Sequence, residues 1–142
     1  MDKKFIKLSK SCISEKEKNA VLNVMHLEYL GMGPQVSKFE SHLEKYLASN
    51  VSCVSSGTAA LHLAFQAIGL KQGDEVLVPS FTYLATFQAI SATGAKPLPV
   101  DIDILTLNIC LKDAESLITS KTKALVFVPS WSCSVGRRIE RA

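Results

Sequence analysis

The sequence predicts an α/β fold in which a parallel-rich sheet is flanked by helices. Two observations lead to this prediction. From Val51 onward, short runs of β-branched and apolar residues alternate with longer apolar stretches of helical period. Residues 1–50, by contrast, show helical patterns only. Strand–helix alternation is typical of parallel sheets, because neighbouring parallel strands need a long crossover connection.

The N-terminal helical segment, residues 1–50, is predicted to hold two helices. The first begins at a capping box made by Ser14 and Glu17 and runs to about Leu30. Its apolar face consists of Ala20, Val21, Val24, Met25 and Leu27. The stretch Gly31-Met-Gly-Pro34 ends this helix. A second amphipathic helix follows, with an apolar side made of Val36, Phe39, Leu43, Tyr46 and Leu47.

The following part, residues 51–128, is predicted to alternate between strands and helices. The strands lie near residues 51–54, 75–79, 97–101 and 123–128. The helices lie near residues 58–68, 82–92 and 111–119. Ligands of such sheets bind beyond the carboxyl ends of the strands. The turns at residues 56–58 and 80–83 are therefore the candidate binding positions.

The turn Ser55-Ser56-Gly57-Thr58 joins a β-branched run to an Ala-rich stretch. A helix that begins here has unpaired backbone N–H groups and a partial positive charge at its first turn, which favours an anion such as phosphate. Gly57 lets the backbone approach a ligand closely, and the Thr58 hydroxyl is a further donor. A glycine that only makes the turn would give the same pattern. The sequence has neither the Gly-Lys-Ser/Thr ending of a P-loop nor G-x-G-x-x-G.

Composition narrows the functional classes. The 47% hydrophobic and 20% charged residues are typical of a globular domain, and a net charge of +3 is too small and scattered for nucleic-acid binding. No apolar run approaches the roughly 20 residues of a membrane span, and the first residues lack the apolar core of a signal peptide. We therefore expect a cytoplasmic protein with neither a nucleic-acid nor a membrane partner.

The cysteines and histidines are isolated from one another along the chain. No C-x-x-C pair occurs, so we expect reduced thiols and no metal site. We interpret the histidines as surface or packing residues. These positions are Cys12, Cys53, Cys110, Cys133, His26, His42 and His62.

Four ordered motifs resemble the DegT/DnrJ/EryC1/StrS family of pyridoxal-phosphate-dependent sugar aminotransferases. They are the stretch from Gly31 to Glu40, the segment around Ser55-Ser56-Gly57-Thr58, Gly73 to Thr86, and Gly94 to Asp103. The resemblance runs from about Gly31 to Val128. It implies that residues 51–128 are part of the large domain of a fold-type I transferase. It also implies amino transfer from glutamate to a nucleotide-linked keto-sugar, for polysaccharide or glycosylated-metabolite biosynthesis, in a homodimer.

The resemblance assigns four cofactor-binding residues. The backbone N–H groups of Thr58 and Ala59, with Gly57 beside them, are expected to hold the phosphate of pyridoxal 5'-phosphate. Tyr83 matches the aromatic position that stacks on the pyridine ring of the cofactor. The alternative for Tyr83 is an aromatic residue buried at the start of a helix.

Three further polar residues lie near these turns. Thr86 is a weak candidate for substrate binding, and the equal alternative is a helical threonine bonded to its own backbone. Asp101 and Asp103 follow the third strand. We interpret them as loop and turn residues, because the carboxylate that pairs with the ring nitrogen comes from a later motif of the family.

No catalytic residue is assigned, because the family's Schiff-base lysine lies in a later S-x-x-x-x-K motif. The string from Ser116 to Lys121 fits that pattern, but it falls in the exposed approach to the next strand and we reject it. We therefore expect an incomplete chain that is inactive alone, with an open sheet edge and unpartnered apolar helix faces. Two alternatives stay open: a fragment of a sugar dehydratase with histidine in place of the lysine, and a non-enzymatic remnant that binds phosphate or a full-length homologue.

Residues 129–142 resemble no part of the family and show no helical or strand period. A single extra C would turn GTC-CAT-CTT-GG, which encodes Val-His-Leu-Gly, into GTC-CCA-TCT-TGG. The second string encodes Val-Pro-Ser-Trp, the residues found at 128–131. We therefore expect that this tail arises from a frameshift.

Overall fold

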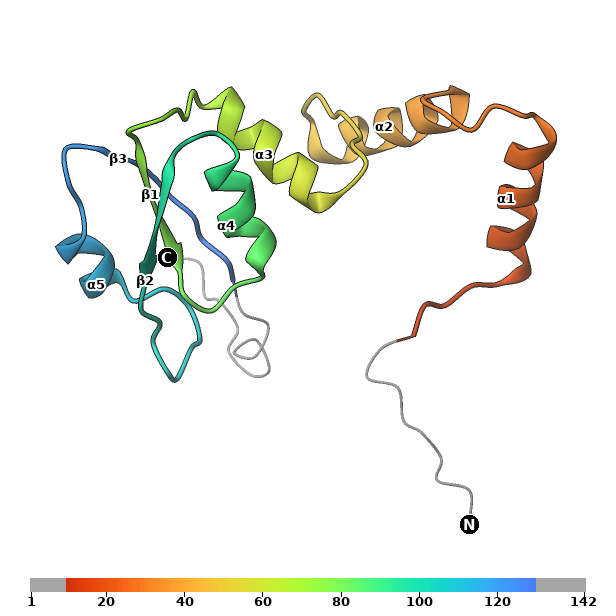
Figure 1. The fold of residues 1–142 in the computed structure, drawn as a ribbon. Helices are drawn as coiled ribbons and strands as arrows, with labels where there is room; N and C mark the ends of the chain where they lie inside the picture. Colours follow the sequence, from red (N-terminus) through yellow and green to blue (C-terminus); the bar gives the residue numbers. More distant parts are fainter. Residues whose placement is uncertain (1–9, 130–142) are drawn as a thin grey trace, which may run out of the picture. The chain divides into compact units, whose positions relative to one another are not determined.

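The computed structural model describes residues 10–129 (Figure 1). The chain divides into two compact units, the first ending at Cys53 and the second beginning at Val54. Apart from Pro129, the tail that we attribute to a frameshift lies outside the described residues. No helix within residues 10–129 is both long enough and apolar enough to cross a membrane.

The first unit contains α1 (Glu15–His26) and α2 (Pro34–Leu47). The predicted capping box is confirmed: the Ser14 hydroxyl accepts the Lys16 N–H at 3.2 Å, and the Glu17 carboxylate accepts the Ser14 N–H at 2.6 Å. The hydrogen bonds from Ser14 lower the pKa of Glu17. The predicted end of α1 near Leu30 is wrong, because Glu28 adopts a left-handed φ of 53° and breaks the helix after His26.

Replacing Ser14 by alanine should loosen the first turn of α1. Loss of an N-cap hydroxyl costs about 1 kcal/mol of helix stability, which corresponds to roughly fivefold faster amide exchange where opening is local. Hydrogen exchange at Lys16 and Lys18 measures the effect. Ser41→Ala, in the exposed middle of α2, is the matched control. Equal exchange rates in the two variants would show that the capping box does not hold α1.

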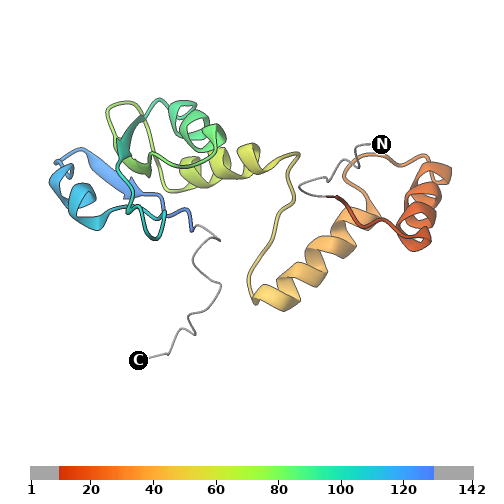
Figure 2. The same cartoon turned by 90° about the horizontal axis from the view of Figure 1, so that it is seen from below.

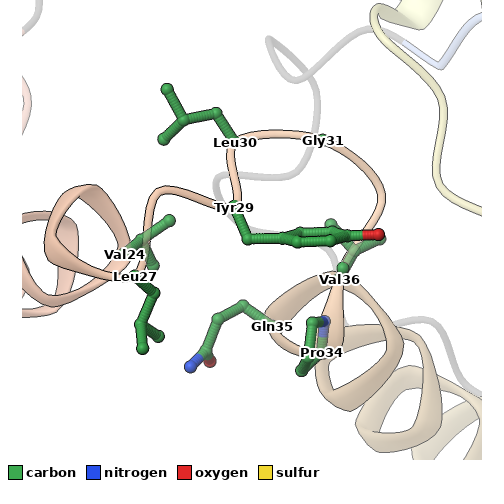
Figure 3. A pocket seen from close by; sticks show the side chains of 9 residues that line it. Val24, Leu27, Tyr29, Leu30, Gly31, Pro34, Gln35 and Val36 are labelled. Atoms are coloured by element: carbon green, nitrogen blue, oxygen red, sulfur yellow. The ribbon is translucent and has the colours of Figure 1, made fainter.

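The connection between the two helices forms a pocket of about 570 Å³, lined by residues of both (Figure 3). A Cβ atom at position 33 would overlap the ring of Tyr29, so only glycine fits there without displacing that ring. Gly33, the second glycine of the Gly31-Met-Gly-Pro34 motif, is thus explained by its packing against Tyr29. Neither α1 nor α2 contains a buried residue, and Val21 and Met25 are exposed. Val24 and Leu27 of the first predicted apolar face and Val36 of the second line the pocket, whereas most other large apolar side chains of the two faces are exposed.

The second unit alternates between helices and strands, as predicted. Its elements are α3 (Gly57–Ala67), β1 (Glu75–Pro79), α4 (Leu84–Ser91), β2 (Lys96–Val100), α5 (Leu111–Ser116) and β3 (Thr122–Leu125). The strand order is β2-β1-β3, and both pairings are parallel. Glu75 pairs with Lys96 of β2 and with Thr122 of β3, where the register shifts by a bulge after Glu75.

The predicted strand at residues 51–54 is wrong. These residues form neither helix nor strand in the described structure. An apolar β-branched run becomes a strand only when a neighbouring strand accepts and donates its hydrogen bonds. Within the described residues, no strand of the sheet pairs with this segment. Instead, the N–H of Cys53 donates to Glu40 of α2 at 2.7 Å, and the N–H of Val51 donates to Glu44 of the same helix at 3.3 Å.

Side chains on the two faces of the sheet enter separate clusters. Val76 and Val78 of β1 pack with Phe65 of α3 and with Ala89 and Ile90 of α4. On the opposite face, Leu77 packs with Val100 of β2 and with residues near α5. Because Leu77 alternates with its neighbours along β1, it points to the other side of the sheet. The second unit is thus a three-layer arrangement with α3 and α4 on one face and α5 on the other (Figures 1 and 2).

Candidate functional site

The candidate site is built on the amino ends of α3 and α4, two helices that pack against each other. Ser56 caps α3: its hydroxyl accepts the N–H of Ala59 at 3.1 Å, and its carbonyl accepts the N–H of Ala60 at 3.0 Å. The connection at residues 68–74 returns α3 to the amino end of β1. The amino end of α3 therefore points away from that edge of the sheet, as the amino end of α4 does (Figure 1).

Two backbone donors of this turn stay free. Within the described residues, the N–H groups of Gly57 and Thr58 have no hydrogen-bond partner, as expected of the first turn of a helix. The prediction differs from the structure at Ala59, whose N–H already donates to Ser56. Sequence reasoning missed this role of Ser56, although a serine directly before a helix is a preferred N-cap residue. We name residues 56–59 the phosphate turn.

Gly57 is required neither by its backbone conformation nor by its neighbours. It is the first residue of α3 and is not among the glycines with positive φ. A Cβ atom added there would meet no atom within 4 Å. A glycine that serves only to make the turn would need a positive φ or a close contact. Neither is found, so the structure presents an open, helical first turn with free donors.

Tyr83 occupies in α4 the N-cap position that Ser56 occupies in α3, but its side chain makes no capping bond. Aromatic residues are not preferred N-caps, so helix formation does not explain this tyrosine. Its side chain is 82% exposed in the described structure. The alternative that Tyr83 is buried packing at the helix start is therefore wrong. The ring is available to stack on a planar ligand.

Thr86 lies one turn into α4 and is only 5% exposed. Its hydroxyl is 3.3 Å from the hydroxyl of Thr82. The two side chains thus satisfy each other across the first turn of α4. Contact of Thr86 with a substrate stays a prediction, and the buried hydroxyl pair does not favour it.

Asp101 and Asp103 lie in the loop and turn after β2, as predicted. The Asp101 carboxylate accepts the N–H of Ile102 at 2.8 Å. The Asp103 carboxylate accepts the N–H groups of Leu105 and Thr106 at 2.9 and 2.8 Å. The backbone hydrogen bonds from Thr106 and Leu105 lower the pKa of Asp103. Both carboxylates are therefore engaged in shaping the loop after β2.

Lys121 lies where the sequence placed it, in the exposed approach to β3. Ser116 ends α5, and the carbonyl of Lys121 accepts the N–H of Glu75 at 2.9 Å. Lys121 therefore sits at the amino end of β3, whereas residues 80–83 follow the carboxyl end of β1. The amino ends and the carboxyl ends of parallel strands lie at opposite ends of the sheet. Lys121, the lysine of the rejected S-x-x-x-x-K match, is therefore not at the candidate site.

The thiols and possible metal ligands are dispersed. Cys12, Cys53 and Cys110 are free cysteines, and Cys133 lies outside the described residues. From residue 10 to residue 129, no three His, Cys, Asp or Glu residues gather in a way that could hold a metal ion.

Comparison with known proteins agrees with this geometry. The model of the DegT/DnrJ/EryC1/StrS aminotransferase family matches residues 11–132. GDP-perosamine synthase of Escherichia coli O157:H7 is 37% identical over 143 residues, which cover 98% of this chain and 39% of that protein. The chain thus spans well under half the length of this curated relative.

Two solved structures share the fold. The PMP form of Spr1654 from Streptococcus pneumoniae, assigned as a sugar aminotransferase, has a TM-score of 0.80 and 33% identity, covering 86% of this chain and 31% of that one. Escherichia coli GDP-4-keto-6-deoxy-D-mannose-3-dehydratase with bound hydrated PLP has a TM-score of 0.75 and 31% identity, covering 84% and 33%. The second unit thus has the α/β fold of the corresponding part of these pyridoxal-phosphate proteins. The chain belongs to the DegT/DnrJ/EryC1/StrS aminotransferase family.

Proposed function

We propose that this chain supplies the phosphate-binding part of a pyridoxal-phosphate-dependent enzyme that transfers an amino group from glutamate to a nucleotide-linked keto-sugar. The observation that carries the proposal is the phosphate turn. There the N–H groups of Gly57 and Thr58 are unpaired and Gly57 faces open space. The family match and the relative GDP-perosamine synthase support the reaction class.

The residues of the site fit the cofactor. The free donors of Gly57 and Thr58, at the positive end of α3, suit a phosphate dianion. The exposed Tyr83 ring suits the flat face of a pyridine. Pyridoxal phosphate supplies the electron sink for amino-group chemistry when bound. The chain's own residues bind and orient it, and the catalytic lysine would come from outside the described residues. We therefore propose that this chain alone is inactive. Because the chain belongs to this family, we also propose that the intact enzyme is a homodimer.

Binding of pyridoxamine 5'-phosphate to the ¹⁵N-labelled chain tests the site. This probe has no aldehyde and does not react with surface lysines. We expect the amide resonances of Gly57 and Thr58 to shift on titration, because both donate to the phosphate. Pyridoxamine without the phosphate is the control and should leave these two amides unchanged. Equal shifts with both compounds, or no shift with either, would contradict phosphate binding at this turn.

Replacing Tyr83 by alanine should weaken binding of pyridoxamine 5'-phosphate without unfolding the chain. A stacked aromatic pair contributes about 0.5–1.5 kcal/mol, which predicts a dissociation constant roughly two- to tenfold higher. Because the side chain is 82% exposed, the thermal midpoint should be unchanged. Tyr46→Ala, at a tyrosine that is 85% exposed, is the matched control. Equal affinities of the two variants would exclude stacking on Tyr83.

A sugar dehydratase is the second candidate, favoured by the likeness to the Escherichia coli 3-dehydratase. DNA sequencing downstream of the Lys121 codon distinguishes the two. For the aminotransferase we expect, in a shifted frame, a strand ending in His-Leu-Tyr-Gly or a similar string, an acidic motif and then S-x-x-x-x-K. Histidine at the lysine position would support the dehydratase. If no frame contains these motifs, a non-enzymatic remnant that binds phosphate or a full-length homologue replaces both.

A further inference from the structure

The sheet of the second unit has β2 and β3 at its two outer edges, and the backbone groups of these edges differ (Figure 1). In β2, the N–H of Lys96 donates toward β1, to the carbonyl of Asp74 at 2.9 Å. Backbone groups of a strand alternate in direction, so the nitrogen atoms of Pro97 and Pro99 face away from β1. Proline has no N–H, and the β2 edge therefore offers no donor at either position.

The β3 edge carries the groups that the β2 edge lacks. The N–H of Val126 donates to the carbonyl of Leu77 in β1 at 2.8 Å, so the ladder continues one residue past the end of β3. By the same alternation, the N–H and C=O groups of Leu125 and Phe127 face away from β1. Within residues 10–129, β1 is the only strand that pairs with β3. Both residues thus offer a donor and an acceptor to a further strand.

The side chains along this edge are apolar and alternate in exposure. Ala124 and Val126 are partly buried against the cluster formed by β1, α3 and α4, whereas Leu125 and Phe127 are 43% and 61% exposed. This alternation is that of an extended chain that continues past Leu125. From Ala124 to Val128 there is no charged residue, proline or glycine. A segment of this composition at an uncovered edge is prone to pair with another strand.

Among the described strands and strand-like segments, the β3 edge of a second copy is the partner that fits. The β2 edge lacks donors, and the N–H groups of Val51 and Cys53 already donate to glutamates. A two-fold axis at Val126 runs two β3 edges antiparallel and places Leu125 of each copy opposite Phe127 of the other. Each of these pairs exchanges two hydrogen bonds. It also sets an aliphatic side chain beside an aromatic ring, which is a favourable cross-strand combination.

This register also keeps like charges apart. Lys123 is the charged residue nearest to Val126 along the chain, and it lies three residues from the axis. The two Lys123 residues are therefore separated by six positions of the ladder, or about 20 Å, which exceeds the screening length of about 10 Å at ordinary ionic strength. We propose that this chain forms a two-fold dimer in which the β3 edges of two copies pair antiparallel.

Sedimentation velocity of the whole chain, from micromolar to millimolar concentration, tests the proposal. We expect a reversible equilibrium between monomer and dimer, because a two-fold contact uses the edge of both copies and closes. Leu125→Pro removes an outward donor, as Pro97 and Pro99 do in β2, and should raise the dissociation constant of the dimer at least tenfold. Leu125→Lys adds a charge to each edge and should act in the same direction. It serves if circular dichroism shows that Leu125→Pro does not fold.

Leu63→Lys is the matched control, because Leu63 is a leucine of α3 in the same unit and is 51% exposed. It should leave the dissociation constant unchanged. Amide hydrogen exchange locates the contact: exchange at Leu125 and Phe127 should slow as the concentration of the unaltered chain rises.

Three results would overturn the proposal. The first is equal dissociation constants for Leu125→Lys and Leu63→Lys. The second is assemblies that grow beyond the dimer, which would mean that the contact is not two-fold. The third is a chain that stays monomeric at every concentration. If the Leu125 and Phe127 amides are protected in that monomer, another segment of the same chain covers the β3 edge.

Discussion

Replacing Ile90 by alanine should unfold much of the second unit. Ile90 of α4 is fully buried, and it packs in one cluster with the β1 residues Val76 and Val78. Truncating such a side chain costs about 2–5 kcal/mol, because both the transfer energy of the removed atoms and the cavity left behind count against the folded state. Typical domains are stable by only about 5–15 kcal/mol. Chemical denaturation followed by circular dichroism should show a much lower midpoint.

Ile104→Ala is the matched control for this prediction. It removes the same atoms from a side chain that is 80% exposed, in the loop after β2. Its free energy of unfolding should change by no more than about 0.5 kcal/mol. Equal destabilisation by both variants would mean that the cluster around β1 is not the core of this unit.

Replacing Gly57 by alanine should weaken ligand binding without lowering the stability of the chain. A Cβ atom there meets nothing within the chain, and alanine is a better helix former than glycine. The free energy of unfolding should therefore stay equal or rise by up to about 1 kcal/mol. The same methyl group would occupy the space through which a phosphate reaches the N–H groups of Gly57 and Thr58. We expect the dissociation constant for pyridoxamine 5'-phosphate to rise about tenfold, which is roughly 1.4 kcal/mol.

Gly31→Ala is the control for Gly57→Ala. Gly31 also has open space around its Cβ position, but it lies outside the phosphate turn. Its replacement should leave the affinity for pyridoxamine 5'-phosphate unchanged. If Gly57→Ala binds as tightly as Gly31→Ala, the phosphate does not approach the backbone at position 57, and the binding site must be sought elsewhere.

The candidate site could be predicted only in part. Unpaired donors at the start of α3 follow from the local sequence alone, but the sequence placed them at Thr58 and Ala59, whereas the structure leaves those of Gly57 and Thr58 free. The occupied donor of Ala59 was missed, because the Ser56 hydroxyl competes for it once the turn has formed. The exposure of Tyr83 could not be predicted either. An aromatic residue beside an apolar run is equally compatible with burial, and only the folded chain shows that Tyr83 is 82% exposed.

The sequence by itself determined the structural features that depend only on neighbouring residues. The capping box at Ser14, the strand at residues 75–79 and the turn at Asp103 were all found, because each is specified by residues within a few positions. Only the tertiary structure decided the features that depend on a partner distant in the sequence. Residues 51–54 have the composition of a strand, yet they form none in the described structure, where Val51 and Cys53 instead donate to Glu44 and Glu40. A strand exists only through its hydrogen-bonded neighbour, and the identity of that neighbour is not encoded in the segment itself.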